Sequence, residues 1–388
     1  MSIFAVLLLA LLAGCASAPR ADLPPGLFSD AAFAAPSEPA DASQLFALSP
    51  DMRAYAHSPA FSQRVRDKGP VQGLLEALYK KGELRLEYES SMTRNAAQTF
   101  AARSGNCLSL VVMTAAFAKE LGMAVRFQGV DVDDTWSRKA SLYLASSHVN
   151  LALGRRPTDI LHSRDQMERL VTVDFLPPPD AARFQTRQLE EDDIAALFLN
   201  NRAAEALVQG RIDDAYWWAR AAVQAEPRRA IAYNTLGVIY QRHGDLAMAE
   251  RAYRAALERE PENVAVMQNL GPVLAALGRP DEARAMAQRV ASIQPFPPYH
   301  YFNKGMVALK AGDYDQARDL FEREVRRAPY NDEFHFWLAV TCLRLGEPQL
   351  AREQLTLAMA SSTRPDSRER YAAKLVHLHD ALAGARPN

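Results

Sequence analysis

The chain has 388 residues, more than one ordinary domain holds, so two or three domains are expected. Its 45 Lys and Arg residues nearly balance its 46 Asp and Glu residues, and no basic stretch with interleaved aromatics indicates nucleic-acid binding. Only three cysteines occur, at positions 15, 107 and 342, which excludes a disulfide framework.

The chain begins with a short apolar run, Ile3 to Ala13, that leads into Gly14 and Cys15. This run is too short to span a bilayer comfortably and is typical of a signal peptide, here residues 1–15. Its ending resembles the lipobox of bacterial lipoproteins. That resemblance implies a lipid on Cys15 and residence in the cell envelope, at the outer membrane facing the periplasm. The alternative is ordinary signal-peptidase cleavage after Ala18, which gives a soluble secreted protein.

Residues 16–44 are rich in Ala and Pro and lack apolar periodicity, which predicts a disordered tether. The chain becomes globular from Leu45. Ser49 and Pro50 indicate a helix start, and residues 71–79 have helical spacing. Thr93 is expected to cap a short helix that runs through Phe100.

The segment Ser104-Gly105-Asn106-Cys107 leads into a mostly apolar stretch that ends before Gly122. Apolar residues lie on nearly every side of this stretch, which predicts a long buried helix. Cys107 then lies on the first turn, where unpaired backbone N–H groups and the helix dipole favour a thiolate. Such a cysteine is suited to be a nucleophile, although a lone cysteine is more often a small core residue.

Alternation of apolar and polar residues predicts strands over 123–132, 147–153 and 171–175. His148 and Asp174 each lie on the face opposite the aliphatic residues of their strand. If these two strands pair directly, facing side chains lie about 5 Å apart, and His148 and Asp174 can hydrogen-bond. The acidic residues at 131, 133 and 134 lack the spacing of a calcium loop and indicate a solvated loop.

Cysteine, histidine and aspartate are the groups that thiol acyl-transfer chemistry requires. Cys107 would attack a carbonyl carbon, His148 would take up and return the proton, and Asp174 would orient the imidazole. The N–H of Cys107 would bind the oxyanion. A metal site formed by His148 and Asp174 is remote because no further ligand has suitable spacing, and no cofactor is expected.

The segment from about 85 to 176 resembles the transglutaminase-like superfamily of papain-related folds. The matching residues are Arg103 to Cys107 after a lead-in helix, Leu121 to Met123 before a strand, Ser147 to Val149, and Val173 with Asp174. The resemblance implies an α+β papain/transglutaminase-like domain, residues 45–180, before a linker at 181–195. It also implies that Cys107 is the nucleophile, His148 the general base and acid, and Asp174 the orienting carboxylate.

Glycines recur every 34 residues in the second half, at 210, 244, 278, 312 and 346, each with an alanine five residues later. A 34-residue period over five units is typical of tetratricopeptide repeats, which are stacked pairs of helices. We expect an all-α superhelix of five repeats over 196–365, with a capping helix and tail at 366–388. Pro272 should kink its helix, and Cys342 should pack in a repeat core.

Arrays of this kind have no chemistry of their own and bind peptide segments on a concave surface. The resemblance to this family implies that several first-helix residues face that groove. They are Asn234, Arg242, Phe302, Lys310, Phe336 and Arg344. Their aromatic and cationic side chains suit a protein or peptide partner with apolar side chains and a carboxylate. The alternative is that each is an ordinary surface residue.

Two functions fit these features. The first is a lipid-anchored envelope enzyme that acts on protein or peptide amide bonds through an acyl-thioester at Cys107, while the repeats recruit substrate or partner. Hydrolysis is favoured over cross-linking, because transfer to an amine requires the exclusion of water. The second is a non-catalytic scaffold, in which the cysteine domain is an idle binding module.

Overall fold

The computed structural model of the chain describes residues 23–80, 87–89, 92–139, 142–154, 170–175, 186–297, 299–362 and 365–384. Residues 87, 88, 131–139, 142–148, 365 and 379–384 are described by their backbone alone. The predicted signal peptide and Cys15 therefore lie outside the described residues. Within the described part, no helix is both long enough and apolar enough to cross a membrane.

Three short helices precede the sheet: α1 (Pro50–Ala56), α2 (Pro59–Lys68) and α3 (Pro70–Tyr79). Each begins with a proline, whose fixed φ and missing N–H suit the first position of a helix. The hydroxyls of Ser49 and Ser58 accept hydrogen bonds from the first turns of α1 and α2. The helices predicted to start at Ser49 and to cover 71–79 are confirmed.

The next helices are α4 (Ala96–Ala102) and α5 (Cys107–Glu120). The expectation that Thr93 caps α4 is wrong: Asn95 is the cap, and the Gln98 side chain in turn accepts a hydrogen bond from the Asn95 backbone N–H. Every side chain from Leu108 to Ala118 in α5 is buried, as the apolar stretch predicts. Two short strands, β1 (Glu87–Tyr88) and β2 (Ser104–Gly105), pair in parallel just before α5.

Four antiparallel strands form one sheet in the order β5-β4-β3-β6. They are β3 (Ala124–Lys139), β4 (Leu142–Gly154), β5 (Val171–Val173) and β6 (Thr186–Leu189). β3 is longer than expected and includes the three acidic positions predicted to form a loop, with a register shift between Val130 and Thr135. One face of the sheet, with Phe127, Leu151 and Leu189, belongs to the same buried cluster as α5.

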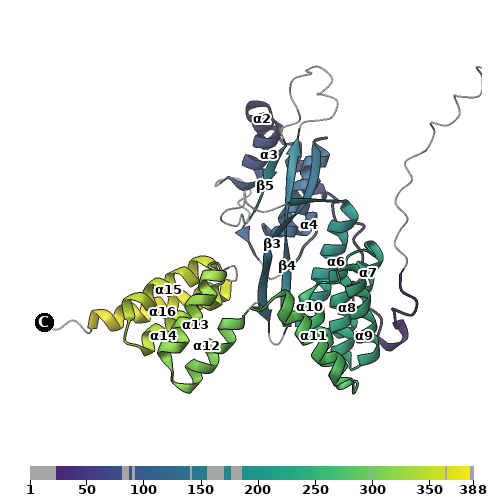
Figure 1. The fold of residues 1–388 in the computed structure, drawn as a ribbon. Coiled ribbons are helices and arrows are strands. Elements are labelled where there is room, and N and C mark those ends of the chain that lie inside the picture. The colour runs from purple at the N-terminus through teal and green to yellow at the C-terminus, as the bar shows by residue number, and fades with distance from the viewer. Residues whose placement is uncertain are drawn as a thin grey trace, which may run out of the picture.

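The second half of the chain is helical, and its helices pair two by two (Figure 1). The pairs are α6 (Glu191–Val208) with α7 (Ile212–Ala225), α8 (Ala230–His243) with α9 (Leu246–Arg259), α10 (Val264–Ala276) with α11 (Pro280–Ile293), α12 (His300–Ala311) with α13 (Tyr314–Arg327), and α14 (Asp332–Arg344) with α15 (Pro348–Ser361). The last helix is α16 (Pro365–Gly384). Pro272 lies inside α10, which continues to Ala276. The five periodic glycines have positive φ and end the first helix of each pair.

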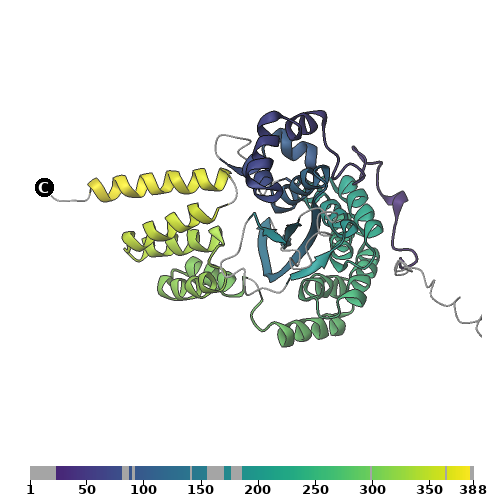
Figure 2. The ribbon, with the colours of Figure 1, turned by 90° about the horizontal axis from the view of Figure 1, so that it is seen from above.

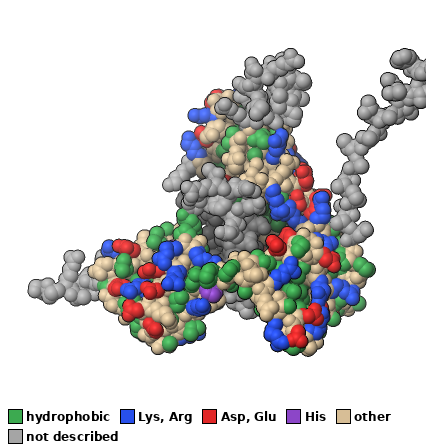
Figure 3. Space-filling view, in the orientation of Figure 1, with side chains coloured by type: hydrophobic (Ala, Val, Ile, Leu, Met, Phe, Trp, Pro, Cys, Tyr) green, Lys and Arg blue, Asp and Glu red, His purple; other side chains and the backbone are tan. Residues whose placement is uncertain are grey.

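The helical pairs fall into two groups with separate cores. Described residues of α6–α10 share one buried cluster with the sheet and α5, whereas α12–α16 have a cluster of their own. α11, between the two groups, contains no buried residue. The view from above shows α6–α11 curving around the sheet while α12–α16 stand apart (Figure 2). Acidic and basic side chains are interspersed over the face seen in Figure 3, in keeping with the near-zero net charge.

The chain from Leu23 to residue 44 corrects the prediction of a disordered tether. Residues 26–38, here called the strap, lie against the first repeats and include the short 3-10 helix η1 (Asp30–Ala32). Leu27 and Phe33 of the strap are only 1% and 7% exposed. The alanine and proline content of this segment predicted disorder. The prediction failed because the partners that order the segment lie some 180 residues further along the chain.

Candidate active site at Cys107

Cys107 is the first residue of α5, and its side chain is half-buried. Asn106 caps the helix: its side-chain oxygen accepts hydrogen bonds from the backbone N–H and the hydroxyl of Ser109, both at 2.9 Å. A cap of this kind fixes the first turn, so the helix N-terminus lies beside the sulfur. The predicted position of Cys107 at the start of a buried helix is therefore confirmed.

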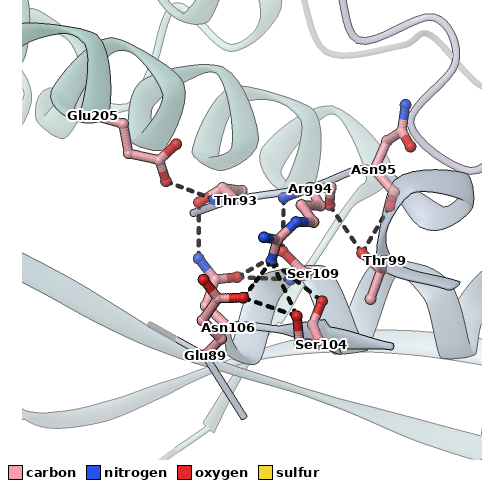
Figure 4. Close-up of polar contacts among 9 residues, drawn as sticks. All are labelled: Glu89, Thr93, Arg94, Asn95, Thr99, Ser104, Asn106, Ser109 and Glu205. Atoms are coloured by element: carbon pink, nitrogen blue, oxygen red, sulfur yellow. Dashed lines mark hydrogen bonds and ion pairs between the residues drawn. The ribbon is translucent and has the colours of Figure 1, made fainter. Parts of the chain in front are cut away.

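The loop before Cys107 is held by an ion pair that the sequence did not suggest (Figure 4). The guanidinium of Arg94 lies 2.9 Å from the carboxylate of Glu89, which also accepts a 2.8 Å hydrogen bond from the hydroxyl of Ser104. Arg94 donates through its backbone N–H to the hydroxyl of Ser109, at 2.8 Å. These contacts join the segment between β1 and α4 to Ser104 of β2 and to the first turn of α5.

A second set of contacts connects Cys107 to the helical array (Figure 4). The side-chain amide of Asn106 donates to the hydroxyl of Thr93 at 2.8 Å, and the backbone N–H of Thr93 donates to Glu205 of α6 at 2.7 Å. Glu205 also lies 3.5 Å from Arg202, which pairs with Glu38 of the strap at 2.6 Å. A continuous polar chain therefore runs from the strap through α6 to the residue before Cys107.

Asp174 follows β5 and pairs with Asn150 of β4. The Asn150 side-chain amide donates to the Asp174 carboxylate at 3.2 Å. The expected arrangement had His148 opposite Asp174, but the register of β4 and β5 places Asn150 there, two residues after His148. His148 lies opposite Val130 of β3, and its side chain lies outside the described residues.

The side chains of Asn150 and Asp174 lie on the sheet face away from α5. Leu151 and Leu153 pack in the cluster that contains α5, and neighbouring residues of a strand point to opposite faces. Gln128 lies opposite Asn150 on the next strand. The side-chain oxygens of Gln128 and Asn150 are buried and accept no hydrogen bond among the described residues. Whether Cys107, His148 and Asp174 converge therefore stays a prediction.

The six residues predicted to line a peptide groove have different surroundings. Asn234 of α8 accepts a 3.0 Å hydrogen bond from Asn269 of α10, so it faces the neighbouring first helix. Phe302 is fully buried among aromatic side chains and belongs to the core, which corrects its assignment to the groove. Phe336 stacks on Tyr371 of α16 at 5.3 Å. The remaining three, Arg242, Lys310 and Arg344, are exposed.

Cys342 is buried in the core of α12–α16, as expected. Burial and the nearby carboxylate of Glu347 raise the pKa of its thiol to about 11. This cysteine is therefore protonated and inert at neutral pH. Among the described residues, no group of three or more His, Cys, Asp or Glu side chains could hold a metal ion.

Sequence reasoning missed the residues that hold the cysteine in place. The cap Asn106 had a detectable signal, because asparagine directly before a helix is a preferred N-cap. Glu89 and Arg94 lie 10 to 15 residues from Ser104 and gave no periodic pattern. Glu205 lies 112 residues from its partner Thr93 and could not be linked to it without the fold.

Comparisons with known proteins concern the helical array. Two family models of the tetratricopeptide repeat match residues 240–302 and 302–366. Similar solved structures include a thermophilic repeat protein from Thermus thermophilus, with 19% identity over 47% of this chain and 99% of that chain at a TM-score of 0.31. Pseudomonas aeruginosa PilF is 21% identical over 49% of this chain and 95% of that chain, at a TM-score of 0.29.

A third similar structure is YrrB, described as a tetratricopeptide-repeat protein with an unusual peptide-binding site. It is 22% identical over 48% of this chain and 94% of that chain, at a TM-score of 0.26. At these identities and TM-scores, the three similarities carry no inference about function. No curated protein matches the chain. The second half of the chain carries tetratricopeptide repeats, a module that binds proteins or peptides.

Proposed function

We propose that the protein is a thiol hydrolase with a transglutaminase-like Cys-His-Asp site, acting on amide bonds of proteins or peptides that its repeats recruit. The observation that supports this most is the placement of Cys107. It is half-buried, it is the first residue of a buried helix, and the side chain of the cap before it is held by the hydroxyl of Thr93 and by Ser109 of the same helix. Helix N-termini stabilise thiolates and developing oxyanions.

In the proposed reaction, the thiolate of Cys107 attacks the amide carbonyl carbon and forms a carbon–sulfur bond. The carbon–nitrogen bond then breaks, and the imidazolium of His148 gives its proton to the leaving amine. Water, deprotonated by His148, attacks the thioester and releases the acid and the thiol. Asp174 would hold the imidazole in the correct tautomer.

Chain geometry supports a role for His148. The 14 residues of α5 span roughly 20 Å, and so do the first residues of β3 up to Val130. Because a tight turn at Gly122 connects α5 to β3, Val130 and its partner His148 return to the level of Cys107. The register shift begins directly after Val130. Such irregularities re-aim side chains and occur next to active sites.

The second candidate function is a non-catalytic scaffold that assembles proteins on its repeats. One observation favours it: Asp174 pairs with Asn150 on the sheet face away from α5. In a scaffold, this row of polar side chains would serve the packing of the sheet, and Cys107 would be an ordinary capped helix start.

We also propose that Cys15 carries a lipid and that the protein resides in the bacterial cell envelope, at the outer membrane facing the periplasm. The strap begins at Gly26, and the 11 residues from Cys15 to it would extend over at most roughly 40 Å. The repeats would then lie close to the membrane surface, because the strap is seated on α7 and α8.

The test compares full-length wild type with Cys107→Ala. Cys107→Ala should retain its substrate, and adding wild type to the retained protein should cleave it at one amide bond, detected by mass spectrometry as a new terminus. The Cys342→Ser variant, altered in a buried thiol, should cleave like wild type. A retained protein that stays intact with wild type, or that Cys107→Ala itself cleaves, would exclude the hydrolase and leave the scaffold.

A further inference from the structure

The strap lies on the first two repeats in the way that a bound peptide lies on a receptor. Side chains of the array form hydrogen bonds with the strap backbone. Three strap N–H groups donate to array side chains, and three strap carbonyls accept from them. The donors are Ser29 to Tyr216 at 3.0 Å, Ala34 to Asp213 at 3.0 Å and Ser37 to Asp214 at 2.7 Å. The acceptors are Gly26 from Arg251 at 2.7 Å, Leu27 from Tyr240 at 2.9 Å and Ala34 from Trp217 at 2.7 Å.

Contacts to the backbone bind an extended segment whatever its side chains are, so specificity must come from pockets. Two strap side chains are buried against the array, and a third forms an ion pair with it. Leu27 is 1% exposed, and Phe33 stacks on Tyr216 with ring centroids 3.9 Å apart and planes 3° apart. Between them, Asp30 pairs with Arg220 at 2.9 Å. The pattern is an aliphatic residue, an acid three positions later and an aromatic residue three positions after that.

Tyr216 and Tyr240, at the centre of this surface, both stay protonated. Burial raises the pKa of Tyr240 to about 12 and raises that of Tyr216 further. Both hydroxyls therefore keep their protons, and each donates and accepts at once. Tyr240 accepts from Ser29 while donating to Leu27, and Tyr216 accepts from Ser29 while donating to Asp30.

We propose that the surface formed by α7, the end of α8 and the start of α9 is a peptide-binding site, which the strap occupies in cis. Its ligand in trans is a peptide segment from a partner protein with the pattern of Leu27, Asp30 and Phe33 and a single turn like that of η1. The residues that bind the strap backbone, such as Asp213, Tyr216 and Tyr240, are not among the groove residues predicted on the first helices. Because residues 39–44 join the strap to the core at Leu45, its effective concentration is on the order of millimolar, and a partner peptide binds only when the strap is released.

The experiment uses the full chain with Leu27→Ala and Phe33→Ala, which keeps the strap attached but removes its two apolar contacts. The probe is a fluorescent synthetic peptide of residues 23–38, and its anisotropy reports binding. The double variant should bind the peptide at least about tenfold more tightly than wild type does, because its own strap competes less. No binding to a folded double variant, or equal binding of a peptide with scrambled sequence, would overturn the proposal.

A double-mutant cycle between Asp30 of the peptide and Arg220 of the array tests whether the peptide binds in the orientation of the strap. Asp30→Asn in the peptide and Arg220→Ala in the double variant should each weaken binding about two- to fivefold, the size expected for a partly exposed ion pair. Together they should weaken it little further, because both remove the same ion pair. Additive losses would contradict the observed pairing and with it the site.

Wild type provides a measurement that does not depend on the folding of any variant. Millimolar unlabelled peptide should speed the hydrogen exchange of the strap amides of Ser29, Ala34 and Ser37, because displaced amides lose their array acceptors. The first turn of α1, where the Met52 N–H donates to the Ser49 hydroxyl, serves as the internal reference. Unchanged exchange in the strap would refute displacement by a peptide.

Discussion

At the residue scale, the side chain of Asn106 caps α5 and binds both Ser109 and Thr93 directly before Cys107. The apolar stretch after Cys107 and the stop at Gly122 were enough to place the cysteine on the first turn of a buried helix. The partners of Asn106 were not predictable, because Thr93 is fixed in turn by Glu205 from another part of the chain. Local periodicity carries information about an element but none about distant side chains.

Asn106→Ala should lower the free energy of unfolding by about 1–2 kcal/mol, because it removes the cap and leaves the Ser109 N–H without its acceptor. Urea unfolding of the purified protein measures this. Asn106→Asp is the matched control, since it keeps the accepting oxygen and loses only the donor to Thr93. An Ala variant as stable as wild type would show that the cap contributes nothing.

The thiol of Cys342 should resist alkylation at neutral pH and become reactive only as the pH approaches 11, because burial raises its pKa. The raised value also has a consequence for stability. A group with a raised folded-state pKa stabilises the fold below its unfolded value, near 9, and this contribution is lost as the pH rises toward 11. Cys342→Ser should flatten that part of the pH–stability curve, and an unchanged curve would argue against the shift.

At the element scale, the sequence predicted the repeats and the strands of the sheet, but not the register in which the strands pair. The 34-residue period identified the helix pairs because each unit repeats the same contacts. The predicted strands exist, but the register that places Asn150 opposite Asp174 depends on how β4 and β5 align. A shift of two residues keeps every side chain on its face, so alternation alone cannot choose between Asn150 and His148.

Glycines 237, 271 and 305 occupy the same position in three successive repeats. Substitution by alanine should affect stability differently at each of them. A Cβ would lie 2.5 Å from the ring of Tyr253 at Gly237 and 2.8 Å from the ring of Phe321 at Gly305. At Gly271 the nearest atom of another element, the backbone oxygen of Ala283, would be 4.0 Å away. The difference is visible in the sequence, because Ala287 stands where the other two units have an aromatic residue.

We therefore expect Gly237→Ala and Gly305→Ala to lower the free energy of unfolding by about 1–3 kcal/mol through overpacking. Gly271→Ala should change it by less than about 1 kcal/mol, because the helix preference of alanine is opposed by Pro272, which disfavours a helical backbone at a preceding residue that has a Cβ. Thermal and urea unfolding of the three variants compare them directly. Equal effects at all three positions would contradict the packing of the repeats.

At the scale of the whole molecule, the array and the cysteine are connected. Glu205 of α6 accepts from Thr93, whose hydroxyl holds the cap before Cys107. The composition of residues 16–44 could not predict that the strap joins this chain through Glu38 and Arg202. Order there comes from docking to distant helices and not from local propensity.

Glu205→Ala should slow the alkylation of Cys107 about threefold, because a looser cap weakens the helix N-terminus beside the sulfur. Glu205→Gln should restore the wild-type rate, since its side-chain oxygen still accepts from the Thr93 N–H. Glu258→Ala, at an exposed position of α9, is the control for a general effect of charge. Equal rates in Glu205→Ala and wild type would show that the array does not influence the cysteine.

The central claim is that the fold activates Cys107. The most direct measurement is the rate of its modification by iodoacetamide near pH 6, followed by mass spectrometry. The rate in the full chain is compared with that in a synthetic peptide of residues 103–111 and in His148→Ala. The account predicts modification at least about tenfold faster in the full chain than in the peptide, with the difference lost in His148→Ala. A rate equal to that of the peptide, unaffected by His148→Ala, would contradict it.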